Sequence, residues 1–171
     1  MPIVGTLVGR DGPLRAVKES RKRMLLQNAI ADALNSADWP FPLAECFHIP
    51  AFALSIGTIA LVDLRMIGAT LRREKVPKLL RDTEPWTLAG LVIVILSGAV
   101  LFLSQPQIYL ENSSFYFKIG CLLVAILYNF TIHRKVAAST TASPGVTKLV
   151  AIVSLLLWAG VVFGGVFIAF V

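Results

Sequence analysis

The last 23 residues of the sequence, 149–171, read LVAIVSLLLWAGVVFGGVFIAFV and contain no charged side chain. A helix that crosses a hydrocarbon layer of about 30 Å needs about twenty residues of this kind. A soluble domain cannot hide an uncharged run of this length. The solvent of this part of the chain must therefore be a lipid bilayer.

The composition extends this conclusion to the whole chain. Of its 171 residues 56% are hydrophobic and 15% are charged, whereas about a quarter of the residues of a soluble domain are charged. The net charge of +6 would suggest nucleic acid as the partner of a soluble protein. Here the basic residues flank apolar segments, where they set topology and attract anionic lipid. We expect the lipid bilayer as partner and no nucleic acid.

Hydropathy predicts four crossings, each close to the length that a membrane helix requires. They cover residues 46–64, 86–104, 115–133 and 149–171. The fold class is therefore all-α, an integral membrane four-helix bundle. A short amphipathic helix should precede it in the membrane interface, because Leu26, Ile30 and Leu34 follow helical spacing.

The loop charges predict the orientation of the bundle. Nine basic residues lie in the first and third loops, whereas the second loop has only Lys118. By the positive-inside rule, the first and third loops are cytoplasmic and both termini face the periplasm. We expect a multi-pass protein of the bacterial inner (cytoplasmic) membrane.

The N-terminal segment contradicts this rule, because six basic residues would lie on the outer side: Arg10, Arg15, Lys18, Arg21, Lys22 and Arg23. Either translation begins at Met24, or residues 1–23 form a disordered basic arm that is translocated. The predicted organisation is a basic arm over 1–23, an interfacial amphipathic segment over 24–45, and the four-helix domain over 46–171.

Ionisable residues lie at both ends of two predicted spans. His48 and Asp63 are fifteen residues apart, as are Lys118 and His133, which is about 22 Å along a helix. Because the two spans run in opposite directions, one cluster should hold His48 and Lys118 at the outer face. The second should hold Asp63 and His133 at the inner face.

More residues join these clusters: Glu45, Cys46 and Cys121 at the outer face, and Arg65 and Arg134 at the inner face. Asn129 lies on the helical stripe of Lys118 and His133. We interpret Asp63 and Arg65 first as an interfacial ion pair, with proton transfer as the alternative, and His133 as a flanking charge. His48 is a candidate ligand of haem or a metal, a titrating group, or a hydrogen-bonding residue.

Small residues indicate close helix packing. Gly90, Ser97 and Ser104 recur every seven residues on the second span, and Gly160 and Gly164 form a GxxxG motif on the fourth. The sequence leaves open whether the partner of GxxxG lies in the same chain or in another protomer.

Three segments, AECFHIPAFALSIGTIALVDLRMIG, PWTLAGLVIVILSGAVLFLS and FYFKIGCLLVAILYNFTIHR, resemble a family of small bacterial four-helix membrane proteins of unknown function. The resemblance covers residues 24–170. Its most specific elements are His48, Gly57, Asp63, Leu64 and Arg65, together with the spacing of Lys118, Asn129 and His133.

The chain is also remotely similar to copper-resistance-D-type and HemJ-type membrane proteins, in the His–Ile start of the first span and the lysine of the third. This resemblance implies a b-type haem on His48, with Lys118 beside a propionate or acidic substrate. The chain departs from these proteins at Asn129, where their third span tends to have a histidine.

Three functions remain. We rank first an accessory or scaffold subunit of a membrane complex. Its protein partners would be further copies of this chain, in a homo-oligomer, or the other subunits of a larger membrane complex. The second is a haem b protein for electron transfer or a HemJ-like oxidoreductase, with His48 and Lys118 at the cofactor. The third is copper handling at the outer face by Cys46, His48 and Cys121, because sulfur and imidazole suit copper. No catalytic motif decides whether the chain is an enzyme.

Overall fold

The computed structural model describes residues 12–170. Four of its helical segments are long and apolar enough to cross a membrane: α2 (Pro40–Ile67), α3 (Val76–Ser104), the segment Ser113–Ala138, and α7 (Pro144–Phe167). No strand occurs among the described residues. The predicted all-α fold with four spans is therefore confirmed, and α2 and α3 begin earlier than hydropathy alone predicted.

Local signals explain where these helices begin and end. Proline occupies the first turn of α2, α3 and α7, where its missing N–H would have had no helical partner. The Asn112 side chain accepts hydrogen bonds from the backbone N–H groups of Ser114 and Phe115 and so caps α5 (Ser113–Tyr128). Gly68 ends α2 at a φ of 89°, a left-handed conformation that favours glycine.

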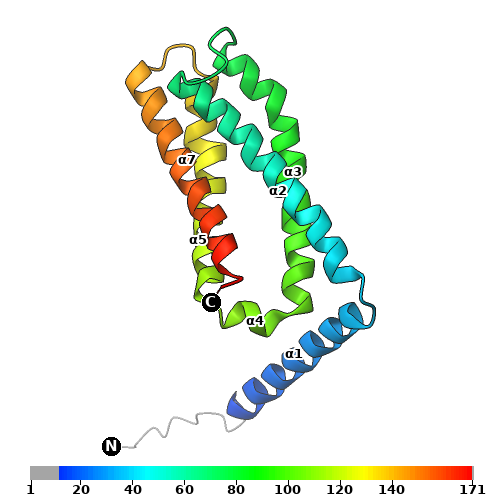
Figure 1. Cartoon of the computed structure of the whole chain (residues 1–171). Coiled ribbons are helices and arrows are strands. Elements are labelled where there is room, and N and C mark those ends of the chain that lie inside the picture. The colour runs from blue at the N-terminus through cyan, green and yellow to red at the C-terminus, as the bar shows by residue number, and fades with distance from the viewer. Residues whose placement is uncertain (1–11, 171) are drawn as a thin grey trace, which may run out of the picture.

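The helices form two antiparallel hairpins, α2 with α3 and α5 with α7, and α2 also packs on α7 (Figure 1). One core cluster surrounds Ile59, Trp158 and Val161, and a second surrounds Val62 and Ala151. The loop from α2 to α3 and the loop before α7 lie at the same end of the bundle (Figure 1). We call this the hairpin end, and we call the other end the α4 end, after the short helix α4 (Pro106–Leu110).

Glycines permit the closest helix contacts. A Cβ atom on Gly164 would lie 3.0 Å from the Cα atom of Lys118, and one on Gly160 would lie 3.2 Å from the Cys121 Sγ atom. The GxxxG motif of α7 therefore packs on α5 of the same chain. On α3, a Cβ atom at Gly90 would lie 2.8 Å from the carbonyl oxygen of Ala51, so the small-residue face of α3 packs on α2.

The third span is not a uniform α-helix. After α5, residues Asn129–His133 form a π-helical turn, η1, before α6 (Arg134–Ala138) completes the span. Such turns insert a residue into an α-helix and often occur at functional sites. Here the turn contains two buried polar residues, Asn129 and His133.

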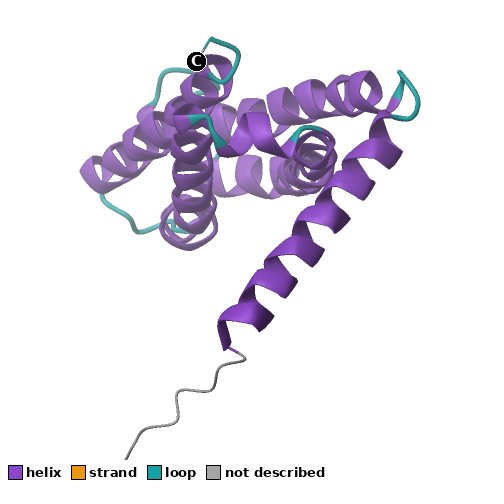
Figure 2. Cartoon of the chain, turned by 90° about the horizontal axis from the view of Figure 1, so that it is seen from below, coloured by secondary structure: helices purple, strands orange, loops and turns teal. Residues whose placement is uncertain are grey.

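An N-terminal helix is present, but its bounds differ from the prediction. The helix α1 covers Gly12–Asn35, so it passes through residue 24 without a break, and residues from Pro40 onward belong to α2. Figure 2 shows that α1 extends away from the bundle. Its end is tied to α3, because Asn35 Nδ2 donates a hydrogen bond of 2.9 Å to the Ser104 carbonyl oxygen. Residues 1–11 of the expected basic arm lie outside the described residues.

Candidate functional site

A cleft at the α4 end has the size of a ligand-binding site. Its volume is about 620 Å³, within the range of roughly 300–1,000 Å³ that is typical of small-molecule pockets. Residues of α2, α3, α4, α5 and α7 line it, among them His48, Phe52 and Lys118. We call it the His48 cleft.

Hydrogen bonds determine which nitrogen of His48 is free. The Nδ1 atom of His48 lies 2.9 Å from Ser97 Oγ, which itself donates its hydrogen to the Ile93 carbonyl oxygen at 2.6 Å. Because a hydroxyl has a single hydrogen, a Ser97 hydroxyl that donates to Ile93 accepts from Nδ1–H of His48. In the neutral imidazole, the lone pair is then on Nε2.

Gly98 allows this position of the ring. A Cβ atom at Gly98 would lie 3.1 Å from Cε1 of His48, which is closer than carbon atoms normally pack. The Cε1 atom of the imidazole therefore lies close to the backbone of α3, and the ring stacks on Phe52 at a centroid distance of 6.3 Å with nearly parallel planes.

Lys118 lines the same cleft as His48, in agreement with the outer cluster that the antiparallel spans predicted. Its ammonium group lies 5.9 Å from the centroid of the Phe52 ring, so Phe52 separates the cation from His48. The side chain is half-buried and passes beside Gly165 of α7. The cleft thus combines one imidazole and one cation on a largely apolar wall.

Aromatic residues form much of that wall. The rings of Phe102, Tyr109 and Phe115 pack on one another with centroid distances of 5.4–6.1 Å. Partial burial raises the pKa of Tyr109 above its usual value, and the carboxylate of Glu45 adds to this shift. Tyr109 therefore stays protonated and neutral at the mouth of the cleft, where Glu45 supplies the nearby negative charge.

Asp63 and His133 form a second polar site, between α2 and η1. The Nε2 atom of His133 lies 2.6 Å from Oδ1 of Asp63, and the two side chains are 2% and 0% exposed. The expected pairing of Asp63 with Arg65 at the interface was wrong, as was the interpretation of His133 as a flanking charge. Both groups are buried inside the bundle.

The two arginines of the expected inner cluster bind other groups. Arg65 donates hydrogen bonds to the backbone carbonyls of Glu74 and Arg72 at 2.6 and 3.3 Å. Arg134 forms an ion pair with Glu84 of α3, with 2.9 Å between Nε and Oε1. Arg65 therefore holds the α2–α3 loop, whereas Arg134 joins α6 to α3.

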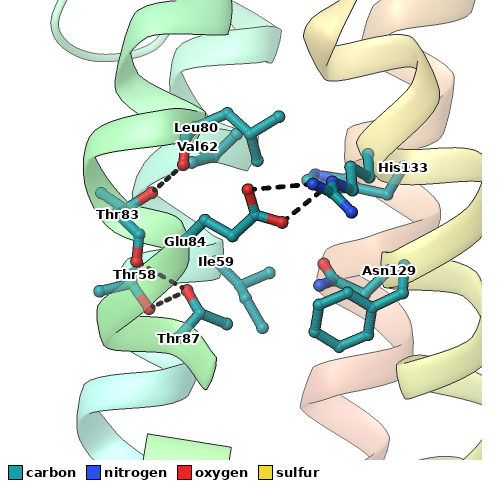
Figure 3. A pocket seen from close by; sticks show the side chains of 11 residues that line it. Thr58, Ile59, Val62, Leu80, Thr83, Glu84, Thr87, Asn129 and His133 are labelled. Carbon is teal, nitrogen blue, oxygen red and sulfur yellow. Dashed lines mark hydrogen bonds and ion pairs between the residues drawn. The ribbon is translucent and has the colours of Figure 1, made fainter. Parts of the chain in front are cut away.

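A small cavity of about 20 Å³ lies beside His133 and the Arg134–Glu84 ion pair. It has room for about one water molecule. Figure 3 shows Thr58, Thr87 and Glu84 on one side of it, with Asn129 and His133 on the other. Asn129 Oδ1 and His133 Nδ1 are buried and have no hydrogen-bond partner in the described part of the chain. A single water is the ligand that this cavity suits.

The structure does not assemble the three copper candidates. Cys46 is exposed, and Cys121 packs against Gly160 of α7. Within residues 12–170, no group of three or more His, Cys, Asp or Glu side chains could hold a metal ion. The predicted copper site therefore lacks its ligand set.

Sequence reasoning missed three residues of these sites. Ser97 was assigned only to a small-residue face, although its hydroxyl determines the tautomer of His48. Glu84 could have been identified from the sequence, because it is an acidic residue just before an apolar span. Tyr109 belongs to a loop in the predicted topology, and only the tertiary structure places it beside Glu45.

Comparisons with known proteins complete the description. A model of a family of unknown function, DUF6644, matches residues 41–171. No curated protein and no solved structure matches the chain. The remote similarity to copper-resistance-D-type and HemJ-type proteins is therefore not supported by these comparisons.

Proposed function

The chain belongs to the family of unknown function DUF6644, and from the geometry of the His48 cleft we propose that it is a membrane protein that binds b-type haem. The proposed axial ligand is Nε2 of His48. The observation that carries this proposal is the hydrogen bond from Nδ1 of His48 to Ser97, because it leaves Nε2 as the free nitrogen beside the cleft. Metal-binding histidines are commonly oriented in this way by a partner of their other nitrogen.

The rest of the cleft also fits a haem. The volume of about 620 Å³ suits a large planar group, and the aromatic wall of Phe102, Tyr109 and Phe115 supplies flat apolar surface. Lys118 would neutralise a propionate. His133, the only other histidine, is buried against Asp63, so within the chain the haem would have one histidine ligand.

A haem held in this way supplies one-electron transfer. The residues of the chain bind and orient it: Ser97 holds the imidazole, Lys118 offers the countercharge, and the apolar wall excludes water. An oxidoreductase reaction would need a substrate beside the cofactor. The proposal therefore concerns haem binding, with electron transfer as its functional consequence.

The test is the visible absorption spectrum of the purified protein after expression with ample haem. We expect a Soret band and, after reduction, the bands of a b-type haem. His48→Ala should remove these bands. His133→Gln is the control for the other histidine; because it also weakens the buried pair with Asp63, the haem signal is compared per folded protein, and most of that signal should remain.

Two results would overturn the proposal. The first is colourless protein that stays colourless when haem is added. The second is a spectrum that survives His48→Ala. The first result would return the chain to the role of an accessory or scaffold subunit, and the second would assign the haem to a group other than His48. In both cases His48 only joins α2 to α3 through Ser97.

A further inference from the structure

A second large cleft opens at the hairpin end, about 590 Å³ in volume, between α2, α6 and the first turns of α3 and α7. Five of the side chains that line it are basic, and none is acidic: Arg65, Lys75, Lys78, Arg81 and Lys148. We call it the basic cleft.

Only part of this positive charge is neutralised within the chain. Lys78 forms an ion pair of 3.1 Å with Glu74, and the Arg65 guanidinium is held by backbone carbonyls. In the part of the chain that the structure describes, no ion pair engages Lys75, Arg81 or Lys148. Lys75 directly precedes α3, Arg81 lies on α3 and Lys148 lies on α7. All three line the same cavity.

The floor of the basic cleft is apolar. Met66 and Ala137 are buried there, and Val136 lies beside them. The rim adds hydroxyl groups from Ser139, Thr140 and Thr147, of which Thr147 donates its hydrogen to the Ser143 carbonyl oxygen. A ligand that suits these surroundings has an anionic head with several acceptor oxygens and an apolar body below it.

We propose that the basic cleft binds the phosphate headgroup of an anionic phospholipid. The cleft lies at the end of the membrane-spanning helices, where headgroups are found, and basic pockets between such helices are known to bind anionic lipids. The apolar floor favours a lipid over a free phosphate, because it would contact the glycerol and the first methylene groups. This inference does not depend on haem binding.

The experiment measures how many molecules of phosphatidylglycerol remain bound to the protein in a neutral detergent, by native mass spectrometry. The test variant is Arg81→Gln with Lys148→Gln, two exposed residues on opposite sides of the basic cleft. The control is Arg72→Gln with Arg73→Gln, which removes the same charge from the same end outside the cleft. Phosphatidylcholine serves as the zwitterionic reference lipid.

We expect about 30-fold weaker retention of phosphatidylglycerol in the test variant, because each cation near a headgroup contributes about 1 kcal/mol and 1.4 kcal/mol is a factor of ten. The control variant should retain the lipid as the parent does. Equal losses in both variants would overturn the proposal in favour of unspecific charge. Full displacement by equimolar glycerol 3-phosphate would overturn it in favour of a soluble phosphate.

Discussion

The two histidines of the chain lie at opposite ends of the bundle and in opposite surroundings. His133 is 1% exposed and paired with Asp63, and the cavity beside it has a volume of about 20 Å³. His48 is half-buried, bonded to a neutral serine, and borders a cleft of about 620 Å³. The same residue type thus serves a closed internal contact at one end and an open site at the other.

The difference teaches which observation indicates a ligand site. Both histidines lie inside apolar spans, and both are expensive to place there. At His133 a carboxylate of the same chain compensates this cost, so the residue needs no external partner at Nε2. At His48 the described part of the chain supplies hydrogen bonds to neutral groups, the Ser97 hydroxyl and the Val94 backbone, and leaves space beside the ring. The open cleft, not burial itself, is what marks His48.

Asp63→Ala should have the largest effect on stability. Removal of one partner leaves His133 buried without compensation, and breaking such pairs typically costs about 3–5 kcal/mol. The measurement is the thermal unfolding midpoint in detergent. Glu111→Ala is the control, because Glu111 is exposed beyond the end of α4. A midpoint equal to that of this control would show that the pair does not stabilise the fold.

Gly164→Val should have the next largest effect and should act on the α4 end. The new side chain would collide with the backbone of α5 at Lys118 and with the Phe117 ring, and overpacking of this kind costs about 1–3 kcal/mol. The shift of Lys118 should also weaken haem retention. Gly120→Val is the matched control, because a Cβ atom there meets nothing within 4 Å. If both variants unfolded at the same temperature, the contact between α5 and α7 would be looser than described.

Ser97→Ala should cost about 1 kcal/mol of stability, the usual value of one hydrogen bond. Because the imidazole loses its fixed orientation, we also expect about tenfold weaker haem binding, measured by titration of haem into the apoprotein. The control is Ser154→Ala, another buried serine, whose hydroxyl has no partner among residues 12–170. Unchanged haem affinity in Ser97→Ala would show that His48 needs no orienting bond.

Glu84→Gln should have the smallest effect, below about 1 kcal/mol, because solvent reaches its partner Arg134 and screens the ion pair. The effect should shrink further at high salt. Unfolding midpoints at low and high salt measure it, with Asp63→Ala as the comparison. A loss as large as that of Asp63→Ala would mean that Glu84 and Arg134 belong to the buried site.

Much of the arrangement could be predicted from the sequence. Hydropathy predicted four spans, and the equal spacing of His48 with Asp63 and of Lys118 with His133 predicted two clusters, one with His48 and Lys118 and one with Asp63 and His133. The start of α1 was not predicted, because residues 12–23 are polar and show no apolar period. The Asp63–Arg65 pair was wrong because closeness along the chain favoured it, whereas side chains two residues apart do not face each other on a helix.

The sequence by itself determined that this chain is a four-span membrane protein, since uncharged runs of about twenty residues have no other stable surroundings. It also determined the separation of the polar residues along each helix, since the rise of a helix per residue is nearly constant. Only the tertiary structure decided which of these residues touch. The rotation of each helix, the π-helical turn at Asn129–His133 and the glycine contacts of α7 placed His133 against Asp63 and opened the cleft beside His48, because packing depends on side chains that are distant in the chain.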